Sequence, residues 1–373
     1  MVQLQPFAAS SDGWLLCSRK DGAGARLANL LWTWRLARGA GLRTMCFWPP
    51  LPGYYADAPG ADDVLDLDAL RASELQDELR VIDGRPGDFV HPRFVTLNPR
   101  QEHDPRDHVV SADPTCSEGT RARVIISTDG PLLRNGETRP DAADEARALF
   151  ARLPWQKRVQ EALDRVVGEH DLGRMVAVHV RSGDIVAGLR DACLGFGPEG
   201  LQPGSRLDRY TQHFFRGCAP TRSYLSLAER FEREGYAILF FSDTPSTAHP
   251  FQERFAPELL FAGALAPAPL SSVQQELFEM ILMSRCHVIV GTKSKFSTLA
   301  SMISGVPVLD VRREATPSDS IEAFRRAAGF DALSPDVQAG VSEVVLRQLE
   351  QGRFLRRWQV SADEIRRMLE HAA

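Results

Sequence analysis

The sequence lacks the short motifs that identify many catalytic and binding classes. It has no GxxxxGK[ST] phosphate loop, no HExxH pair and no GxSxG nucleophile elbow. Its six cysteines are scattered without a CxxC pair, so a zinc site built on cysteines is not expected. We therefore expect neither a metal nor a cofactor in this protein.

Targeting signals and long apolar runs are also lacking. The N-terminus does not show the charged-then-apolar pattern of a signal peptide, and no apolar stretch has membrane-spanning length. We expect a cytoplasmic protein with reduced cysteines and no transmembrane segment, while peripheral membrane association stays open. Pairing of Cys193 with Cys218 is the alternative if the protein is exported.

Charge of one sign does not dominate the chain. Asp and Glu number 49 and Lys and Arg number 44, and the formal net charge is −5. A nucleic-acid-binding protein is expected to show a basic patch or a surplus of basic residues, so this class is not favoured. The length of 373 residues, with 43% hydrophobic and 25% charged residues, indicates a globular protein of two domains.

The first half of the chain opens with strand, glycine turn, helix and strand. Residues 14–17 and 44–48 have the pattern of buried strands, and 27–38 that of a helix between them. This βαβ order predicts a parallel sheet. Further strands are expected at 81–82 and 123–128, and a helical pair at 141–169, so the first α/β domain is placed at residues 1–168.

The second half alternates strands and helices more clearly and predicts a second parallel α/β domain at residues 169–345, followed by a C-terminal helix at 346–373. A segment rich in Gly, Pro and Arg at 188–220 is expected to be a loop. The expected strands are 175–180, 237–243, 287–292 and 306–310, and the expected helices are 223–234, 276–284 and 296–304.

Polar side chains follow three of these strands. Ligands of open parallel sheets bind at the carboxyl ends of the strands, so the three clusters predict one site. Their guanidinium, ammonium and hydroxyl groups suit a phosphorylated nucleotide. The clusters are His179, Arg181, Ser182 and Asp184; Ser242, Asp243 and Thr244; and Thr292, Lys293, Ser294, Lys295, Ser297 and Thr298.

Arg181 is the central residue of this hypothesis. A guanidinium offers a diphosphate two parallel charge-assisted hydrogen bonds and stays ionised. If the diphosphate leaves during the reaction, the contact strengthens as charge builds. Gly183 permits a close backbone turn, and Asp184 is expected to orient Arg181. A structural arginine paired with Asp184 or Asp243 is the alternative.

Each supporting residue has a structural alternative. His179 either contacts the nucleotide or is a core histidine. Ser242 and Asp243 either bind base or ribose or cap the next turn. Residues 294–298 form either an anion seat or an ordinary helix N-cap, and Lys293 and Lys295 either bind phosphate or are solvated.

Two further motifs lie in the first 70 residues. Gly22 and Gly24 form a tight turn into a helix without the third glycine of the dinucleotide fingerprint, and would face the ligand if the two sheets oppose each other. Asp66-Leu67-Asp68 matches a metal-nucleotide motif, but it stands before a helix, where acidic residues are favoured without any metal.

The segment His179-Val-Arg-Ser-Gly-Asp184 resembles the HxRxGD signature of the fucosyltransferase superfamily that includes the α1,2-, α1,6- and protein O-fucosyltransferases. The likeness is greatest to the nodulation α1,6-fucosyltransferases. It extends to the turn and helix from Gly22, to 237–243, to 280–289 and to 294–299, in one order along the chain.

The resemblance implies a GT-B-like fold, two facing parallel-sheet (Rossmann-like) domains with the active site in the cleft. It implies GDP-fucose as donor substrate, inversion at the sugar carbon and no metal, with Arg181 on the donor phosphates. Nucleotide contacts would fall on His179, Asp243 and 294–298. Ala25 stands where many members have Asn, and Ser182 replaces a second basic residue, so Lys293 or Lys295 would complete the phosphate clamp.

The acceptor is expected to be a glycan or glycoconjugate hydroxyl that a carboxylate activates. The candidates for the base are Asp21, Asp184 and Asp191. The candidates for acceptor contact are Arg26 and, in the expected loop at 188–220, Arg190, Arg206, Arg209 and Tyr210, with a solvated loop as the alternative. A GT-B glycosyltransferase with another nucleotide sugar, a sugar-nucleotide epimerase and a non-catalytic binding protein are the competing interpretations.

Overall fold

In a computed structural model, the chain forms two compact units. Unit 1 comprises residues 1–173, 262–286 and 295–307, and unit 2 comprises residues 174–261, 287–294 and 308–373. The structure describes residues 13–19, 22–50, 59–85, 94–95, 125–126, 140–242, 244–255, 260–266, 269–292 and 294–370.

Unit 1 contains a five-stranded sheet of order β3-β2-β1-β5-β4, in which every neighbouring pair is parallel. Strands β1 and β2 are short and buried, as expected for a parallel sheet covered by helices. Its strands are β1 (Trp14–Ser18), β2 (Arg43–Trp48), β3 (Leu79–Asp83), β4 (Phe94–Val95) and β5 (Ile125–Ile126).

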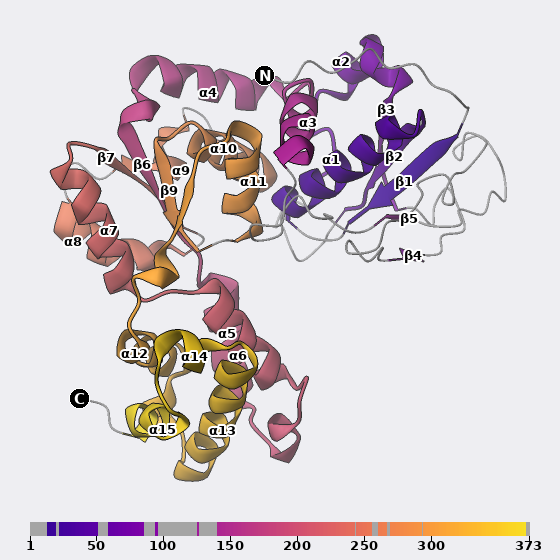
Figure 1. Cartoon of the computed structure of the whole chain (residues 1–373). Helices are drawn as coiled ribbons and strands as arrows, with labels where there is room; N and C mark the ends of the chain where they lie inside the picture. The colour runs from indigo at the N-terminus through magenta and orange to yellow at the C-terminus, as the bar shows by residue number, and fades with distance from the viewer. Residues whose placement is uncertain are drawn as a thin grey trace. The chain divides into compact units, whose positions relative to one another are not determined.

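Helix α1 (Ala23–Gly39) is the central helix of unit 1 and packs against β1 and β2 (Figure 1). It is buried on nearly all sides because apolar residues are distributed around its whole circumference. The other helices of unit 1 are α2 (Leu67–Ala72), α3 (Pro140–Phe150), α4 (Lys157–Glu169), α9 (Ala262–Leu265), α10 (Ser272–Ser284) and α11 (Lys295–Ser304).

A buried carboxylate fixes α1 to its neighbours. Glu78, 3% exposed, accepts hydrogen bonds from the Trp34 indole at 3.1 Å, from Arg152 at 2.7 Å and from Arg38. Burial raises the pKa of Glu78, but the bonds from the two arginines outweigh it, so the pKa lies below its usual value. The carboxylate therefore stays charged and paired inside the unit.

Unit 2 contains a second five-stranded sheet, of order β10-β9-β6-β7-β8, again parallel throughout. From β6, the chain adds β7 on one side of the sheet and later adds β9 on the other side. Ligands of open parallel sheets bind at such a switch point in the strand order. The strands are β6 (Met175–Val180), β7 (Ala237–Ser242), β8 (Leu260–Phe261), β9 (Val288–Gly291) and β10 (Val308–Asp310).

The helices of unit 2 form two groups. Helices α7 (Thr221–Arg233) and α8 (His249–Phe255) share a hydrophobic core with β6, β7 and β9. The second group is a helical bundle, drawn at the bottom of Figure 1. It has a hydrophobic core of its own that includes the stacked rings of Phe215 and Phe324. Its members are α5 (Gly183–Leu194), α6 (Arg206–Gly217), α12 (Pro317–Ala328), α13 (Pro335–Gln351), α14 (Phe354–Trp358) and α15 (Ala362–Glu370).

The expected loop at 188–220 is wrong, because this segment is mostly helical. Most of its glycines and prolines lie in the connection between α5 and α6, which ends at Gly204 with a φ of +79°. That left-handed conformation suits glycine. Helix α6 then begins at a Ser205 cap, and its apolar residues at helical spacing enter the bundle core.

The α/β class with two parallel sheets is confirmed. The unit boundary at 173/174 lies close to the expected 168/169, but α9, α10 and α11 group with unit 1 and the C-terminal segment forms part of three helices. That the two sheets face each other across a cleft stays a prediction. Cys193 and Cys218 are buried free thiols, and no described helix combines the length and apolarity needed to cross a membrane.

Candidate functional site

The register of the second sheet brings the carboxyl ends of its strands to one level. His179 pairs with Gly291 of β9 and Val180 pairs with Ser242 of β7. Arg181 follows β6 directly, and Thr292 follows β9 directly. The first residues beyond these strands therefore emerge at the same edge of the sheet, as the sequence pattern predicts.

Arg181 and Asp184 form an ion pair at this edge. The Nη2 atom of Arg181 lies 3.1 Å from Oδ2 of Asp184, and Oδ1 of Asp184 accepts the Ile185 amide at 3.0 Å. Asp184 lies in the first turn of α5, where a negative charge interacts favourably with the helix dipole. The carboxylate is thus held by two contacts and orients the guanidinium, whose side chain is 35% exposed.

His179 is buried on β6, with 7% of its surface exposed. Burial and the nearby charge of Arg181 lower its pKa to about 4. The imidazole is therefore neutral near pH 7. Its burial favours the core-histidine alternative, and its contact with a nucleotide stays a prediction.

Ser182 and Gly183 start helix α5. Ser182 holds the N-cap position without a capping bond from its side chain, and its carbonyl accepts the Val186 amide at 2.7 Å. Gly183 is the first helical residue. Both lie beside Arg181 in sequence, and their roles as donor contacts stay predictions.

The Ser242 hydroxyl is used within its own turn. It accepts the Thr244 amide at 3.1 Å and bonds to the Thr247 hydroxyl. This is the turn-capping alternative considered for Ser242. Asp243, the other residue of that pair, lies outside the described residues.

The residues around the start of α11 divide between the two units. Ser294, 9% exposed, belongs to unit 2 and lines the pocket described below. Ser297 is fully buried within unit 1, whereas Lys295 is exposed and Thr298 is partly exposed. Lys293 lies outside the described residues.

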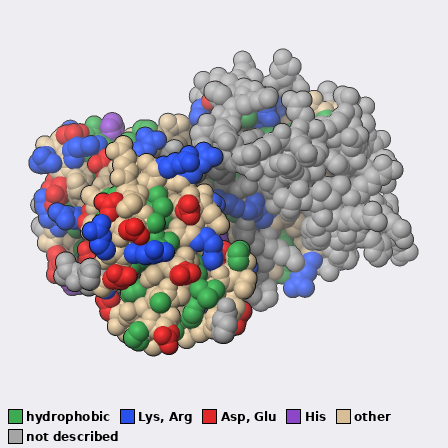
Figure 2. Space-filling view, turned by 60° about the horizontal axis from the view of Figure 1, so that its bottom comes forward, with side chains coloured by type: hydrophobic (Ala, Val, Ile, Leu, Met, Phe, Trp, Pro, Cys, Tyr) green, Lys and Arg blue, Asp and Glu red, His purple; other side chains and the backbone are tan. Residues whose placement is uncertain are grey.

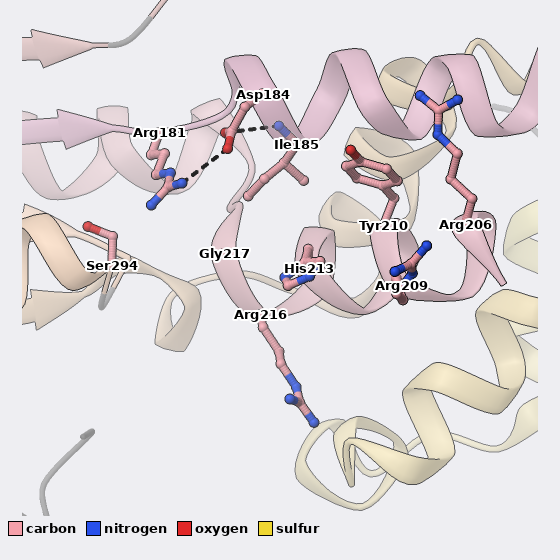
Figure 3. A pocket seen from close by; sticks show the side chains of 10 residues that line it. All are labelled: Arg181, Asp184, Ile185, Arg206, Arg209, Tyr210, His213, Arg216, Gly217 and Ser294. Atoms are coloured by element: carbon pink, nitrogen blue, oxygen red, sulfur yellow. Dashed lines mark hydrogen bonds and ion pairs between the residues drawn. The ribbon is translucent and has the colours of Figure 1, made fainter. Parts of the chain in front are cut away.

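A pocket of about 530 Å³ surrounds Arg181 in unit 2 (Figure 3). Four arginines and a single carboxylate line it, whereas on the face that Figure 2 shows, the basic and acidic side chains of the described residues are interspersed. Its size suits a small polar ligand. The lining residues are Arg181, Asp184, Ile185, Arg206, Arg209, Tyr210, His213, Arg216, Gly217 and Ser294.

Helix α6 supplies most of this lining from one face. Arg206, Arg209, His213 and Arg216 follow one another at spacings of three and four residues, which places them on one side of a helix. The opposite side, including Leu207, Thr211 and Phe214, is buried. His213 and Arg216 were not among the predicted site residues, although this spacing is visible in the sequence once the segment is taken as a helix.

The orientation of α6 is fixed by a buried carboxylate. Asp208 accepts hydrogen bonds from the Gly204 amide, from Arg347 and from Gln348, at 2.7 to 2.8 Å. Burial raises the pKa of Asp208, but these bonds outweigh it and the pKa lies below its usual value. Because Asp208 faces α13, the face of α6 that carries the arginines is turned away from α13 and lines the pocket.

Among the base and acceptor candidates, Asp184 and Arg209 line the pocket. Asp191 lies outside this lining and pairs with Arg206 at 3.4 Å. Arg26, 3% exposed, lies in unit 1 over the Trp48 ring, 5.1 Å from its centroid. Asp21 lies outside the described residues.

The Gly22 turn in unit 1 has a protein partner. The Ala23 amide at the start of α1 donates to Glu276 of α10 at 3.1 Å, and Gly24 packs beside Phe296 of α11. A carboxylate of the chain itself therefore occupies part of this helix N-terminus. The pKa of Glu279, one turn further along α10, is raised to about 7. Burial is the main cause, the hydrogen bond from Gln275 opposes it, and the charge of Glu276 raises the pKa further. The donor-binding roles of Gly22 and Gly24 stay predictions.

The Asp66-Leu67-Asp68 motif has structural partners. Asp66 caps α2 by accepting the Ala69 amide at 2.8 Å, and Asp68 pairs with Arg71 at 2.8 Å. Within the described ranges, no group of three or more His, Cys, Asp or Glu residues is arranged to hold a metal ion.

No family model and no curated protein matches this sequence. Among solved structures, it is similar to the fucosyltransferase NodZ from Bradyrhizobium, with 16% identity over 81% of this chain and 95% of that chain and a TM-score of 0.46. It is similar to POFUT1 in complex with GDP-fucose, with 11% identity over 82% and 99% of the two chains and a TM-score of 0.47.

Proposed function

We propose that this protein is an inverting, metal-independent glycosyltransferase that transfers fucose from GDP-fucose to a hydroxyl of a glycan or glycoconjugate. The observation that carries the proposal is the position of Arg181. It stands at the carboxyl end of β6, oriented by Asp184, in a pocket that Ser294 also lines. The HxRxGD resemblance of the same segment supports GDP-fucose as the donor.

In this reaction the acceptor oxygen forms a bond to C1 of the sugar while the bond from C1 to the diphosphate oxygen breaks. The hydroxyl proton passes to a base, and the negative charge appears on the leaving diphosphate. Arg181 stabilises that charge with paired hydrogen bonds. Attack from the face opposite the diphosphate inverts the configuration at C1.

Asp184 is the base candidate that lines the pocket. Asp191 is the less favoured candidate because it pairs with Arg206 outside the lining. A cytoplasmic location belongs to the same proposal and is supported by the cysteines of the described ranges, which are buried free thiols.

Thermal shift with GDP, UDP, dTDP and GDP-fucose tests the donor. We expect GDP and GDP-fucose to raise the melting temperature, and a response to UDP or dTDP alone would point to another nucleotide sugar. Incubation of GDP-fucose with mixed glycan acceptors should then release GDP. Conversion of the donor sugar without release of GDP would indicate an epimerase and contradict the proposal.

A further inference from the structure

The face of α6 that lines the pocket carries more positive charge than one diphosphate contact requires. Arg206 and Arg181 each have an acidic partner, Asp191 and Asp184 respectively. Arg209 and His213 are exposed, and no acidic partner for either is present in the described part of the chain. Figure 3 shows both on the α6 side of the pocket, across from Arg181.

Placing arginines three residues apart on one helix face is unfavourable unless an anion compensates them, because like charges at this spacing repel. Elsewhere in the bundle, Arg347 pairs with Asp208 and Arg326 pairs with Glu322. The chain as a whole has a formal net charge of −5, so a cluster of arginines in one pocket is not a consequence of a surplus of basic residues.

An aromatic ring stands beside these side chains. Tyr210 lies between Arg206, 5.7 Å above its ring, and His213, whose ring centroid is 6.5 Å away. The ring packs directly on Gly188 of α5, where a Cβ atom would overlap it. Tyr210 also lines the pocket, so the part of its side chain that faces the pocket is available to a sugar that carries a charged group.

We propose that the acceptor is an acidic glycan, with its phosphate or carboxylate group held by Arg209 and His213 and its sugar ring against Tyr210. This inference rests on the proposed function, because it assigns the donor diphosphate to Arg181 and the acceptor to α6. A rise of 1.5 Å per residue puts Arg209 and His213 about 6 Å apart along the helix, within reach of one anionic group. Arg216 points away from Arg181 in Figure 3 and is not part of this subsite.

The test measures equilibrium binding to the full chain saturated with GDP. The probes are a neutral disaccharide, the same disaccharide with a uronic acid and the same disaccharide with a phosphate monoester. We expect one or both acidic probes to bind at least tenfold more tightly than the neutral probe, and the stronger one identifies the anion. Equal binding of all three, or no binding by any, overturns the acidic acceptor.

Variants assign the effect to residues. Arg209→Gln should weaken acidic-probe binding about tenfold, as expected for loss of a hydrogen bond to a charged group, and leave neutral-probe and GDP binding unchanged. Arg233→Gln, an exposed change on α7, should alter neither. Gly188→Ala should weaken all three probes by displacing Tyr210.

The outcomes separate this inference from the proposed function. Loss of GDP binding in Arg209→Gln would assign α6 to the donor and overturn the acceptor subsite while leaving the transferase proposal in place. Failure of the wild-type protein to bind GDP would contradict the transferase proposal itself. Equal losses in Arg209→Gln and Arg233→Gln would overturn the specific role of Arg209.

Discussion

The guanidinium of Arg181 and the carboxylate of Asp184 lie 3.1 Å apart at the point where β6 ends and α5 begins. The pair has features of both interpretations of Arg181, a structural ion pair and a ligand-binding residue. Asp184 restrains the arginine as in a structural ion pair, yet Arg181 keeps 35% of its side chain exposed and lines a pocket. An exposed ion pair of this kind contributes little to stability, so its position favours a role in binding.

We expect Arg181→Lys to lower kcat about a hundredfold with little change in stability, because an ammonium cannot make the paired contact with a diphosphate. Turnover should be measured with GDP-fucose and an acceptor, and folding by thermal denaturation. Arg174→Lys, at the amino end of the same strand, is the matched control and should retain wild-type turnover. Wild-type turnover in Arg181→Lys would remove Arg181 from the mechanism.

Removal of divalent metal should leave activity intact. The Asp66 carboxylate is used as a helix cap, so Asp66→Ala should lower the free energy of unfolding by about 1 kcal/mol and leave turnover unchanged. Activity with excess EDTA and urea denaturation measure these two effects. Strong inhibition by EDTA that Mn²⁺ reverses would instead indicate a metal-dependent reaction.

His179 should make the protein sensitive to acid. Its pKa is about 4 in the folded protein against 6.5 for a free histidine, so the unfolded state binds more protons between these values. Stability is therefore lost as the pH falls from 6.5 towards 4, by on the order of 3 kcal/mol. Urea denaturation at pH 7 and pH 4.5 should show a smaller loss for His179→Gln than for the wild type. Equal losses would show that the imidazole is not buried in its neutral form.

Glu279 should have the opposite pH dependence. Its pKa is about 7 in the folded protein against 4.5 for a free glutamate, so the folded state binds more protons in this range. Stability falls as the pH rises from 4.5 through 7, and Glu279→Gln should be more stable than the wild type at pH 8 by on the order of 2–3 kcal/mol. At pH 4 the two proteins should be nearly equal. A variant less stable than the wild type at pH 8 would contradict this account.

Much of the secondary structure could be predicted from sequence because local pattern decides it. Strands β1, β6 and β9 are short apolar runs bounded by turn residues, and α4 and α7 have apolar residues at helical spacing. The prediction of a loop at 188–220 is wrong because it rested on the glycines and prolines of this segment. The apolar residues on either side of them have the spacing of a helix. The bonds of Glu276 to Ala23 and of Asp208 to Arg347 could not be predicted, since each joins elements more than a hundred residues apart in sequence.

The sequence by itself determined the α/β class and the arrival of Arg181 at a strand end, because both depend on short runs of neighbouring residues. Only the tertiary structure decided what surrounds Arg181. The bonds of Asp208 to α13 turn the arginine face of α6 outward, and the close contact of Gly188 with Tyr210 holds α6 against α5. These are long-range contacts, whose geometry depends on how whole helices pack together, and no local pattern specifies them.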